Sequence, residues 1–155
     1  MNLYFRLIWV IIRSRFRPRI TSDNIYNEVG SIVLPNDLDI NLHMNNGRFL
    51  TLCDLGRVDM FVRSGLFTVM RQQKWIPVVA SVSMTFIKSL YLFERIRIVS
   101  HITHWDEKYF YSTHSIYRKD EIVAEGTSKA LVVSKDSGRI TPENVIDTVN
   151  RAMGN

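Results

Sequence analysis

The sequence predicts an α+β domain in which an antiparallel sheet packs against one long buried helix. Apolar residues recur at helical spacing from Asn46 to Gly65 on more than one stripe, which indicates a buried helix. Segments rich in β-forming residues lie on both sides of this helix, and charged turn clusters separate the last three. With 155 residues, 46% hydrophobic and 23% charged, the chain is expected to form one domain with an ordinary core.

The strands are expected in a simple order. A short strand at 28–34 leads into a polar turn, and the long helix follows and stops at Gly65. Four β-rich segments come next, at 78–88, 95–104, 109–117 and 122–133. Hairpin turns are predicted at 106–108 and 119–121. The order indicates a four-strand antiparallel meander after the helix.

The C-terminal tail is predicted to be a surface helix. Thr141, Pro142 and Glu143 are typical of a helix start, and the pattern continues to Met153. We therefore expect three parts, which are an N-terminal segment 1–27, a main domain 28–135 and a helical tail 136–155.

The first residues form an apolar run followed by arginines. The run from Met1 to Ile12 is interrupted by Arg6 and is too short to span a bilayer. A signal peptide carries its positive charge before the apolar region, whereas here the charge follows it. One alternative is an interfacial helix on an anionic membrane surface, with contact through 1–19. The other is packing on the domain or on a second subunit, which the absence of a polar face favours.

Charge and cysteine content limit the partners and the chemistry. The net charge of +5 and pI near 9.6 favour anionic partners such as coenzyme A or anionic lipid. No RNA-recognition motif, zinc spacing or basic helix stripe is present, so we expect no nucleic acid. The single cysteine, Cys53, excludes a disulfide within the chain and is expected to be a small core residue. We predict a cytoplasmic protein, with membrane association as the alternative.

A polar turn just ahead of the long helix is the strongest functional signal. Between Pro35 and Gly47 it holds two carboxylates, Asp37 and Asp39, and the imidazole of His43. Acids so close together resist burial, and the N–H groups at a helix start favour negative charge. The turn could therefore supply a carboxylate base or nucleophile, an imidazole and backbone donors for an oxyanion. The alternative is that these are ordinary loop and cap residues.

The same stretch resembles a known signature. The run from Leu34 to Leu50 reads LPNDLDINLHMNNGRFL. It resembles hotdog-fold thioesterases of the 4-hydroxybenzoyl-CoA thioesterase type, and within them the thioesterase superfamily member 6-like group. The resemblance covers roughly 28–133 and is more specific to the superfamily than to a substrate.

The resemblance implies a fold, an assembly and an activity. The fold is a hotdog, a curved antiparallel sheet wrapped around a long central helix, in a homodimer or dimer of dimers with shared sites. The activity is hydrolysis of acyl-CoA or acyl-carrier-protein thioesters, without a cofactor or metal. The family's catalytic carboxylate aligns with Asp39, and Asp37 aligns with a residue that supports the turn. Substrate-binding groups are expected at the helix start, at Asn45, Asn46, Gly47 and Arg48.

Two further comparisons bear on the mechanism. The run from Asp39 to His43 is similar to the D-x-N-x-H of plant acyl-carrier-protein thioesterases, which implies catalytic roles for Asp39, Asn41 and His43. That family also uses a downstream Glu, and 82–88 contains none. Hotdog enoyl-thioester hydratases have a similar motif, D-x-N-P-x-H. This chain lacks its proline and its spacing, which argues against a hydratase. A non-catalytic acyl-binding module on the same fold stays open.

The remaining candidates are basic and imidazole side chains. The phosphates of coenzyme A are expected near basic side chains on the strands, at Lys88, Arg95, Arg97, Arg118 or Lys129. His101, His104 and His114 lie in strand patterns without metal-ligand spacing, so surface or pocket-wall positions are predicted.

Overall fold

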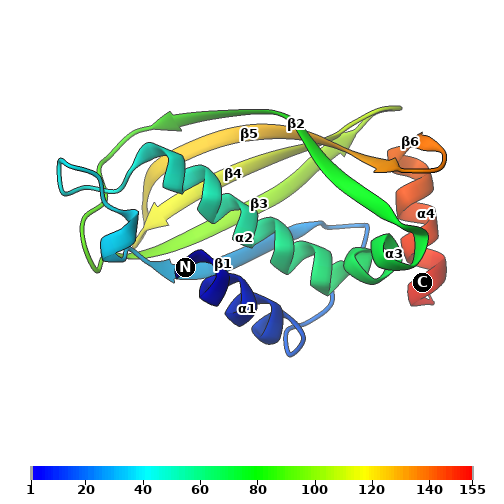
Figure 1. The fold of residues 1–155 in the computed structure, drawn as a ribbon, viewed down its shortest axis with the longest axis horizontal. Coiled ribbons are helices and arrows are strands. Elements are labelled where there is room, and N and C mark those ends of the chain that lie inside the picture. Colours follow the sequence, from blue (N-terminus) through cyan, green and yellow to red (C-terminus); the bar gives the residue numbers. More distant parts are fainter. Residues whose placement is uncertain (1, 155) are drawn as a thin grey trace.

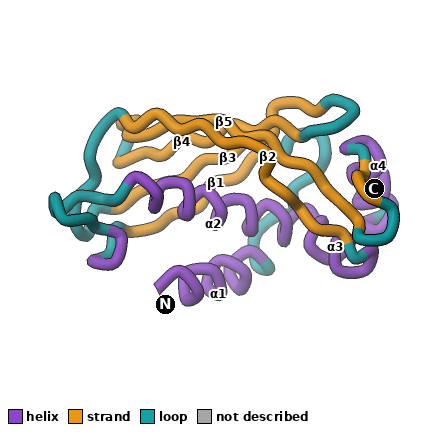
Figure 2. The backbone as a smooth tube through the Cα atoms, turned by 45° about the horizontal axis from the view of Figure 1, so that its top comes forward, coloured by secondary structure: helices purple, strands orange, loops and turns teal. Residues whose placement is uncertain are grey.

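The computed structural model describes residues 2–154 and confirms the predicted α+β architecture. A curved sheet wraps around one long helix, α2, while α1 lies on the open side of that helix (Figures 1 and 2). In chain order the elements are α1 Asn2–Ser14, β1 Tyr26–Ile32, the 3-10 turn η1 Pro35–Asp37, α2 Asn46–Ser64, α3 Leu66–Gln73, β2 Trp75–Phe86, β3 Arg95–Trp105, β4 Phe110–Arg118, β5 Glu121–Ser134, β6 Gly138–Ile140 and α4 Pro142–Met153.

The strand order differs from a simple meander. The sheet runs β1-β3-β4-β5-β2, with every named pair antiparallel and β6 paired to β5. The predicted meander is correct for β3, β4 and β5 and wrong for β2, which pairs with β5 instead of β3. An alternation of apolar and polar residues identifies a strand but not the strand with which it pairs. The connection 87–94 is long enough to cross the sheet. As a result β1 and β2 lie at opposite edges.

Local signals at both ends fix the central helix. At its start the side chain of Asn45 accepts a hydrogen bond from Gly47 N–H at 2.8 Å, and at its end Gly65 has a left-handed φ of 83°. A Cβ added to Gly56 would lie 2.9 Å from Ser100 Oγ, so this glycine allows α2 to approach β3 closely. Phe49, Leu52, Cys53, Leu55 and Met60 are buried on α2.

The N-terminal segment and the tail both pack onto the main body. Val10 belongs to the larger core cluster, with Leu3 and Leu7 packed against it, and Val145 of α4 belongs to the second cluster. The opposite face of α1 remains exposed, so the expectation of packing is correct for one face only. Among the helices in residues 2–154, none is long and apolar enough to cross a membrane.

A buried carboxylate, Asp59, ties α1 and β1 to α2. It is 1% exposed and accepts hydrogen bonds from Ser14 Oγ at 2.6 Å and Asn27 Nδ2 at 2.9 Å. The guanidinium groups of Arg17 and Arg63 lie 3.2 and 3.1 Å from its oxygens. Burying a charge is tolerated only when it is paired and hydrogen-bonded, and here every oxygen has such partners.

We predict that Asp59→Ala strongly destabilises the protein. Removing one partner of a buried ion pair costs about 3–5 kcal/mol, which for a chain of this size lowers Tm by about 10 °C. Differential scanning calorimetry measures the change. The control is Asp54→Ala, which removes a carboxylate that is 59% exposed on the same helix and pairs with Arg57. The control is expected to cost at most about 1 kcal/mol. Equal losses of stability in both variants would contradict the structural role assigned to Asp59.

Candidate active site

The polar turn between η1 and α2 is a closed loop held by its own backbone. Asp39 N–H donates to His43 O at 2.9 Å, and Leu42 N–H donates back to Asp39 O at 3.1 Å. Leu42 has a positive φ of 60°, which few non-glycine residues adopt outside tight turns. Met44, only 1% exposed, fixes the turn on the neighbouring loop because its N–H donates to Leu90 O at 2.7 Å.

The first carboxylate of the turn, Asp37, is completely buried. Its oxygens accept from Arg6 at 2.6 Å and from Arg48 at 2.9 and 3.0 Å, and from Leu34 N–H at 2.8 Å. These contacts join α1, η1 and the start of α2. With both oxygens engaged, Asp37 has the geometry of a structural support for the turn.

The second carboxylate, Asp39, is open to solvent. Its side chain is 23% exposed, and one oxygen accepts from Asn41 N–H at 2.8 Å. The other oxygen lies 3.7 Å from Nδ1 of His43, which is beyond ordinary hydrogen-bond distance. The structure thus brings Asp39 and His43 together at the surface, while Asn41 contributes its backbone and has an exposed side chain.

The start of α2 offers fewer free donors than its sequence suggests. The N–H of Gly47 donates to the Asn45 side chain, and the N–H of Arg48 donates to Asn45 O at 2.9 Å. The guanidinium of Arg48 points to Asp37. Within residues 2–154 the N–H of Asn46 has no acceptor, so it is the first donor available to a ligand at this helix end.

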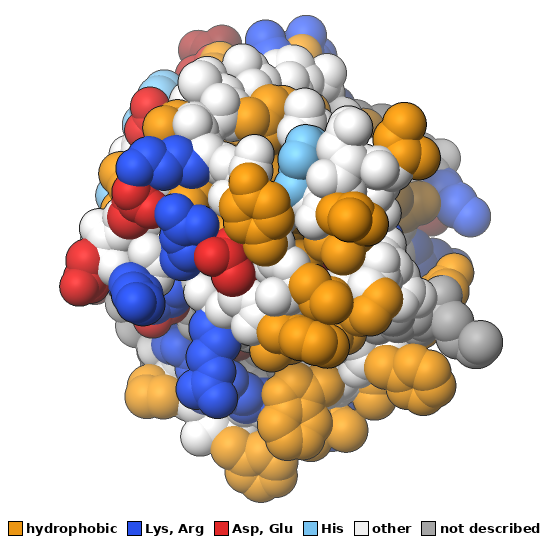
Figure 3. Space-filling model, turned by 90° about the vertical axis from the view of Figure 1, so that its left-hand side faces the viewer, with side chains coloured by type: hydrophobic (Ala, Val, Ile, Leu, Met, Phe, Trp, Pro, Cys, Tyr) orange, Lys and Arg blue, Asp and Glu red, His pale blue; other side chains and the backbone are white. Residues whose placement is uncertain are grey.

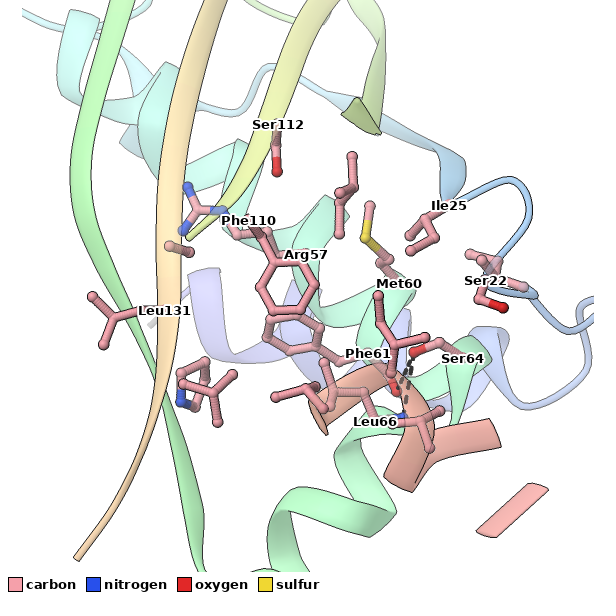
Figure 4. Close-up of a pocket in the computed structure, with 18 of the residues that line it drawn as sticks. Ser22, Ile25, Arg57, Met60, Phe61, Ser64, Leu66, Phe110, Ser112 and Leu131 are labelled. Atoms are coloured by element: carbon pink, nitrogen blue, oxygen red, sulfur yellow. Dashed lines mark hydrogen bonds between the residues drawn. The ribbon is translucent and has the colours of Figure 1, made fainter. Parts of the chain in front are cut away.

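A second feature, an apolar cavity, lies under the sheet toward the other end of α2. Its volume is about 90 Å³, whereas one water needs only about 10–15 Å³. Arg57, Met60 and Phe61 of α2 and Phe110 of β4 point toward it (Figure 4). Other parts of the lining are Pro77 of β2, Ala130 of β5 and Ile146 of α4. The wall is mostly hydrocarbon, which suits an apolar chain.

One wall of this cavity contains a buried histidine. His114 is 2% exposed, and its ring nitrogens lie 3.0 Å from Ser100 Oγ and 2.8 Å from Ser128 Oγ. Burial, with a smaller effect from the charge of Arg57, lowers the pKa of His114 to about 4. The ring is therefore neutral at physiological pH and acts as a fixed polar part of the wall.

Other candidate residues occupy structural positions. Cys53 is fully buried, and burial raises its pKa to about 12, so its thiol is unreactive. His104 stacks on Tyr111 with ring centroids 4.4 Å apart, and His101 forms an edge contact with Tyr26. Within residues 2–154 no group of three or more His, Cys, Asp or Glu could hold a metal.

Most of the basic side chains proposed for phosphate binding already have partners. Lys88 pairs with Glu121, Arg118 pairs with Glu94 and Glu121, Arg97 pairs with Glu28, and Lys129 lies over the ring of Tyr109. Acidic and basic side chains lie next to one another on part of the face that forms the left-hand side of Figure 1 (Figure 3). Arg95, opposite Ile32 at the same end as the turn, forms no ion pair within residues 2–154.

Sequence reasoning did not locate the cavity, although the predicted pocket-wall position is correct for His114. The cavity wall is built from segments far apart in the chain, among them α2, β2, β4, β5 and α4. The one available signal was a histidine at an inward position of an alternating strand, since a buried histidine needs hydrogen-bond partners.

Comparison with known proteins was made on sequence and on structure. A family model described as the thioesterase-like superfamily matches residues 33–145. Protein THEM6 from Xenopus laevis is 34% identical over 122 residues, which is 78% of this chain and 59% of the relative. The chain therefore spans about three-fifths of that relative's length.

Solved structures match about four-fifths of the chain. YbaW, a probable thioesterase from Escherichia coli, superposes with a TM-score of 0.73 at 19% identity, covering 81% of this chain and 97% of its own. DHNA-CoA thioesterase from Staphylococcus aureus gives 0.71 at 15% identity, covering 83% and 91%. These matches confirm the predicted hotdog fold.

The buried His114 generates a prediction about pH. Its pKa is about 4 in the folded protein, while a histidine in an unfolded chain titrates near 6.5. Between these values only the unfolded chain binds the proton, so lowering the pH favours unfolding. From pH 7 to pH 5 we expect this residue to cost about 2 kcal/mol of stability.

The measurement is urea unfolding at both pH values in wild type and His114→Gln, which keeps hydrogen-bonding groups but cannot titrate. The other histidines are common to both proteins, so the variant should lose less stability over this range. Identical losses in both proteins would contradict the depressed pKa.

Proposed function

The chain belongs to the thioesterase-like superfamily, and on that premise we propose that it hydrolyses acyl thioesters with Asp39 as the reacting carboxylate. The family as a whole is one of thioester hydrolases. The single observation that carries the proposal is the contrast between the two carboxylates of the turn. Asp37 is buried with both oxygens paired, and Asp39 lies partly exposed at the start of α2.

The proposed reaction uses groups that lie close together in this turn. Asp39 either attacks the thioester carbonyl carbon or takes a proton from the water that attacks it. In the first route the carbon–sulfur bond breaks as an anhydride forms with Asp39, and water then cleaves this anhydride. In the second route water adds first, and the carbon–sulfur bond breaks afterwards. In both routes a proton from the water ends on the leaving thiolate, so the products are the free acid and the thiol. Charge developing on the carbonyl oxygen is stabilised by Asn46 N–H and the positive end of the α2 dipole.

Neighbouring residues orient Asp39. The N–H of Asn41 holds one carboxylate oxygen at 2.8 Å and so directs the other. His43, 33% exposed and 3.7 Å away, is placed to position the carboxylate or the attacking water. Asn45 caps the helix, and an added Cβ at Gly47 would lie 3.1 Å from the Asn45 amide oxygen. Gly47 therefore keeps this cap undistorted.

We assign the thiol carrier as coenzyme A. One structural neighbour is described as a DHNA-CoA thioesterase, and the net charge of +5 suits a phosphorylated carrier. Arg95 is the basic side chain best placed to bind a phosphate, because it lies at the same end as the turn and has no acidic partner within residues 2–154.

We further propose a homodimer in which each site uses both chains. Strand β2 is an edge with exposed Val78, Val79 and Val82, and such an edge needs covering. If two β2 strands pair about a two-fold axis, the Phe86 end of one meets the Pro77 end of the other. Phe86 packs on Phe49 near the start of α2 with ring centroids 5.2 Å apart, and Pro77 lines the cavity.

This pairing provides a place for the acyl chain. Within one chain, the start of α2 and the cavity residue Phe61 lie about 20 Å apart, because an α-helix rises 1.5 Å per residue. The partner's cavity, in contrast, would open beside Asp39. We therefore place the thioester at Asp39 of one chain and the apolar acyl group in the cavity of the other.

The second candidate is a non-catalytic acyl-thioester-binding module. Two observations favour it, the absence of Glu from 82–88 and the engaged N–H of Gly47. It predicts binding of acyl-CoA without thiol release.

We predict that Asp39→Asn lowers kcat by at least about a hundredfold, because the amide keeps the shape but loses basicity and nucleophilicity. Thiol release from a panel of acyl-CoA thioesters measures it. Asp147→Asn, the same change at an exposed position on α4, is the control and should retain activity. Near-wild-type turnover in Asp39→Asn would contradict the catalytic role proposed for this residue. Absence of turnover in the wild type, with retained binding, would favour the binding module.

A further inference from the structure

The outer face of α1 is an apolar surface that no other part of residues 2–154 covers. Leu3, Leu7 and Val10 face the core. The opposite face exposes five large side chains by 49–70%, namely Tyr4, Phe5, Ile8, Trp9 and Ile12, and Phe16 just after the helix is 86% exposed. We call these six residues the α1 outer face. An ordinary surface helix has charged and polar groups in these positions.

The orientation of this face is fixed by inward polar contacts. Near the start of α1, Arg6 donates to Asp37 and to Ile32 O at 2.8 Å. At its end, Ser14 Oγ donates to the buried Asp59, and Arg17 pairs with the same carboxylate. Arg6 and Ser14 are therefore engaged on the protein side, which holds the α1 outer face toward the outside.

The position of α1 separates this face from the proposed dimer edge. α1 contacts α2, and its Arg6 reaches the end of β1, whereas β2 lies at the opposite edge of the sheet (Figures 1 and 2). A second copy bound along β2 would leave the α1 outer face uncovered. Figure 3 shows hydrophobic side chains gathered over the lower part of the molecule, where α1 lies in Figure 1.

Positive charge borders the same face. Arg13, Arg15 and Arg19 are exposed, and none of them forms an ion pair in the described part of the chain. No acidic residue occurs before Asp23. Apolar and aromatic groups beside unpaired arginines match the acyl and phosphate layers of an anionic lipid surface.

We propose that the α1 outer face docks the folded domain on an anionic membrane surface. Trp9, Phe5 and the aliphatic side chains enter the interfacial layer, and Arg13, Arg15 and Arg19 contact lipid phosphates. This docking is peripheral, because the inner face of α1 stays packed on the protein. It does not depend on the proposed thioesterase activity.

The test is co-sedimentation of the full chain with phosphatidylcholine vesicles that contain or lack phosphatidylserine. The protein should bind the anionic vesicles at least tenfold more tightly, and added salt should release it. Phe5→Ser with Trp9→Ser should reduce binding at least tenfold, and neutralising Arg13, Arg15 and Arg19 to Gln should remove the salt dependence. Both variants should keep the wild-type Tm, since these side chains make no core contacts.

The matched control is Phe67→Ser on α3, which removes an aromatic side chain that is 47% exposed away from α1. It should bind vesicles like the wild type. Equal loss in this control, or absence of salt-sensitive binding in the wild type, would overturn the proposal. If Phe5→Ser with Trp9→Ser changed the mass in light scattering instead, the occupant would be a second copy and the lipid assignment would be wrong.

Discussion

The rest of the site depends on one buried carboxylate, Asp37. It is fully buried, and it joins Arg6 of α1, Arg48 of α2 and the N–H of Leu34. A buried charge without partners is very costly, so all three segments must be in place before the turn can close. Once they are, the chain has little freedom at the next residues. Asp39 is held two positions later, with one oxygen bound by Asn41 N–H and the other beyond ordinary hydrogen-bond distance of His43. The buried acid Asp37 thus determines where Asp39, the carboxylate proposed to react, lies.

Local patterns predicted the central helix well. Its start at Asn46 and its stop at Gly65 follow from a cap and a left-handed glycine, which involve only near neighbours. The strand pairing of β2 depended on the path of the connection 87–94, and α3 is too short to give a clear period, so neither could be read from periodicity. In the site, the sequence located both carboxylates. It could not show that Arg48 faces Asp37 or that Asn45 occupies the N–H of Gly47, because these depend on side-chain direction.

The polar turn and the apolar cavity, the two features that the proposed thioester hydrolysis requires, lie apart in the molecule. The polar turn has the carboxylate and a free backbone donor at one end of α2, and the cavity lies beyond the middle of the same helix. A partly exposed polar turn suits the attacking water and the charged carrier of the proposed reaction, whereas a hydrocarbon wall suits an acyl chain. In the proposed dimer the two would meet at the exposed β2 edge, since two-fold pairing would bring the turn of one chain to the cavity of the other.

The most direct test of this shared site is subunit complementation. One chain has Asp39→Asn, and the other has Ala130→Phe, which fills the cavity. Each homodimer should be inactive but folded by circular dichroism. A mixed dimer, isolated with two different affinity tags after co-expression, contains one site with both parts intact, so the account predicts about half the activity of the wild-type dimer. A mixed dimer as inactive as its parents, or an active Ala130→Phe homodimer, would contradict it.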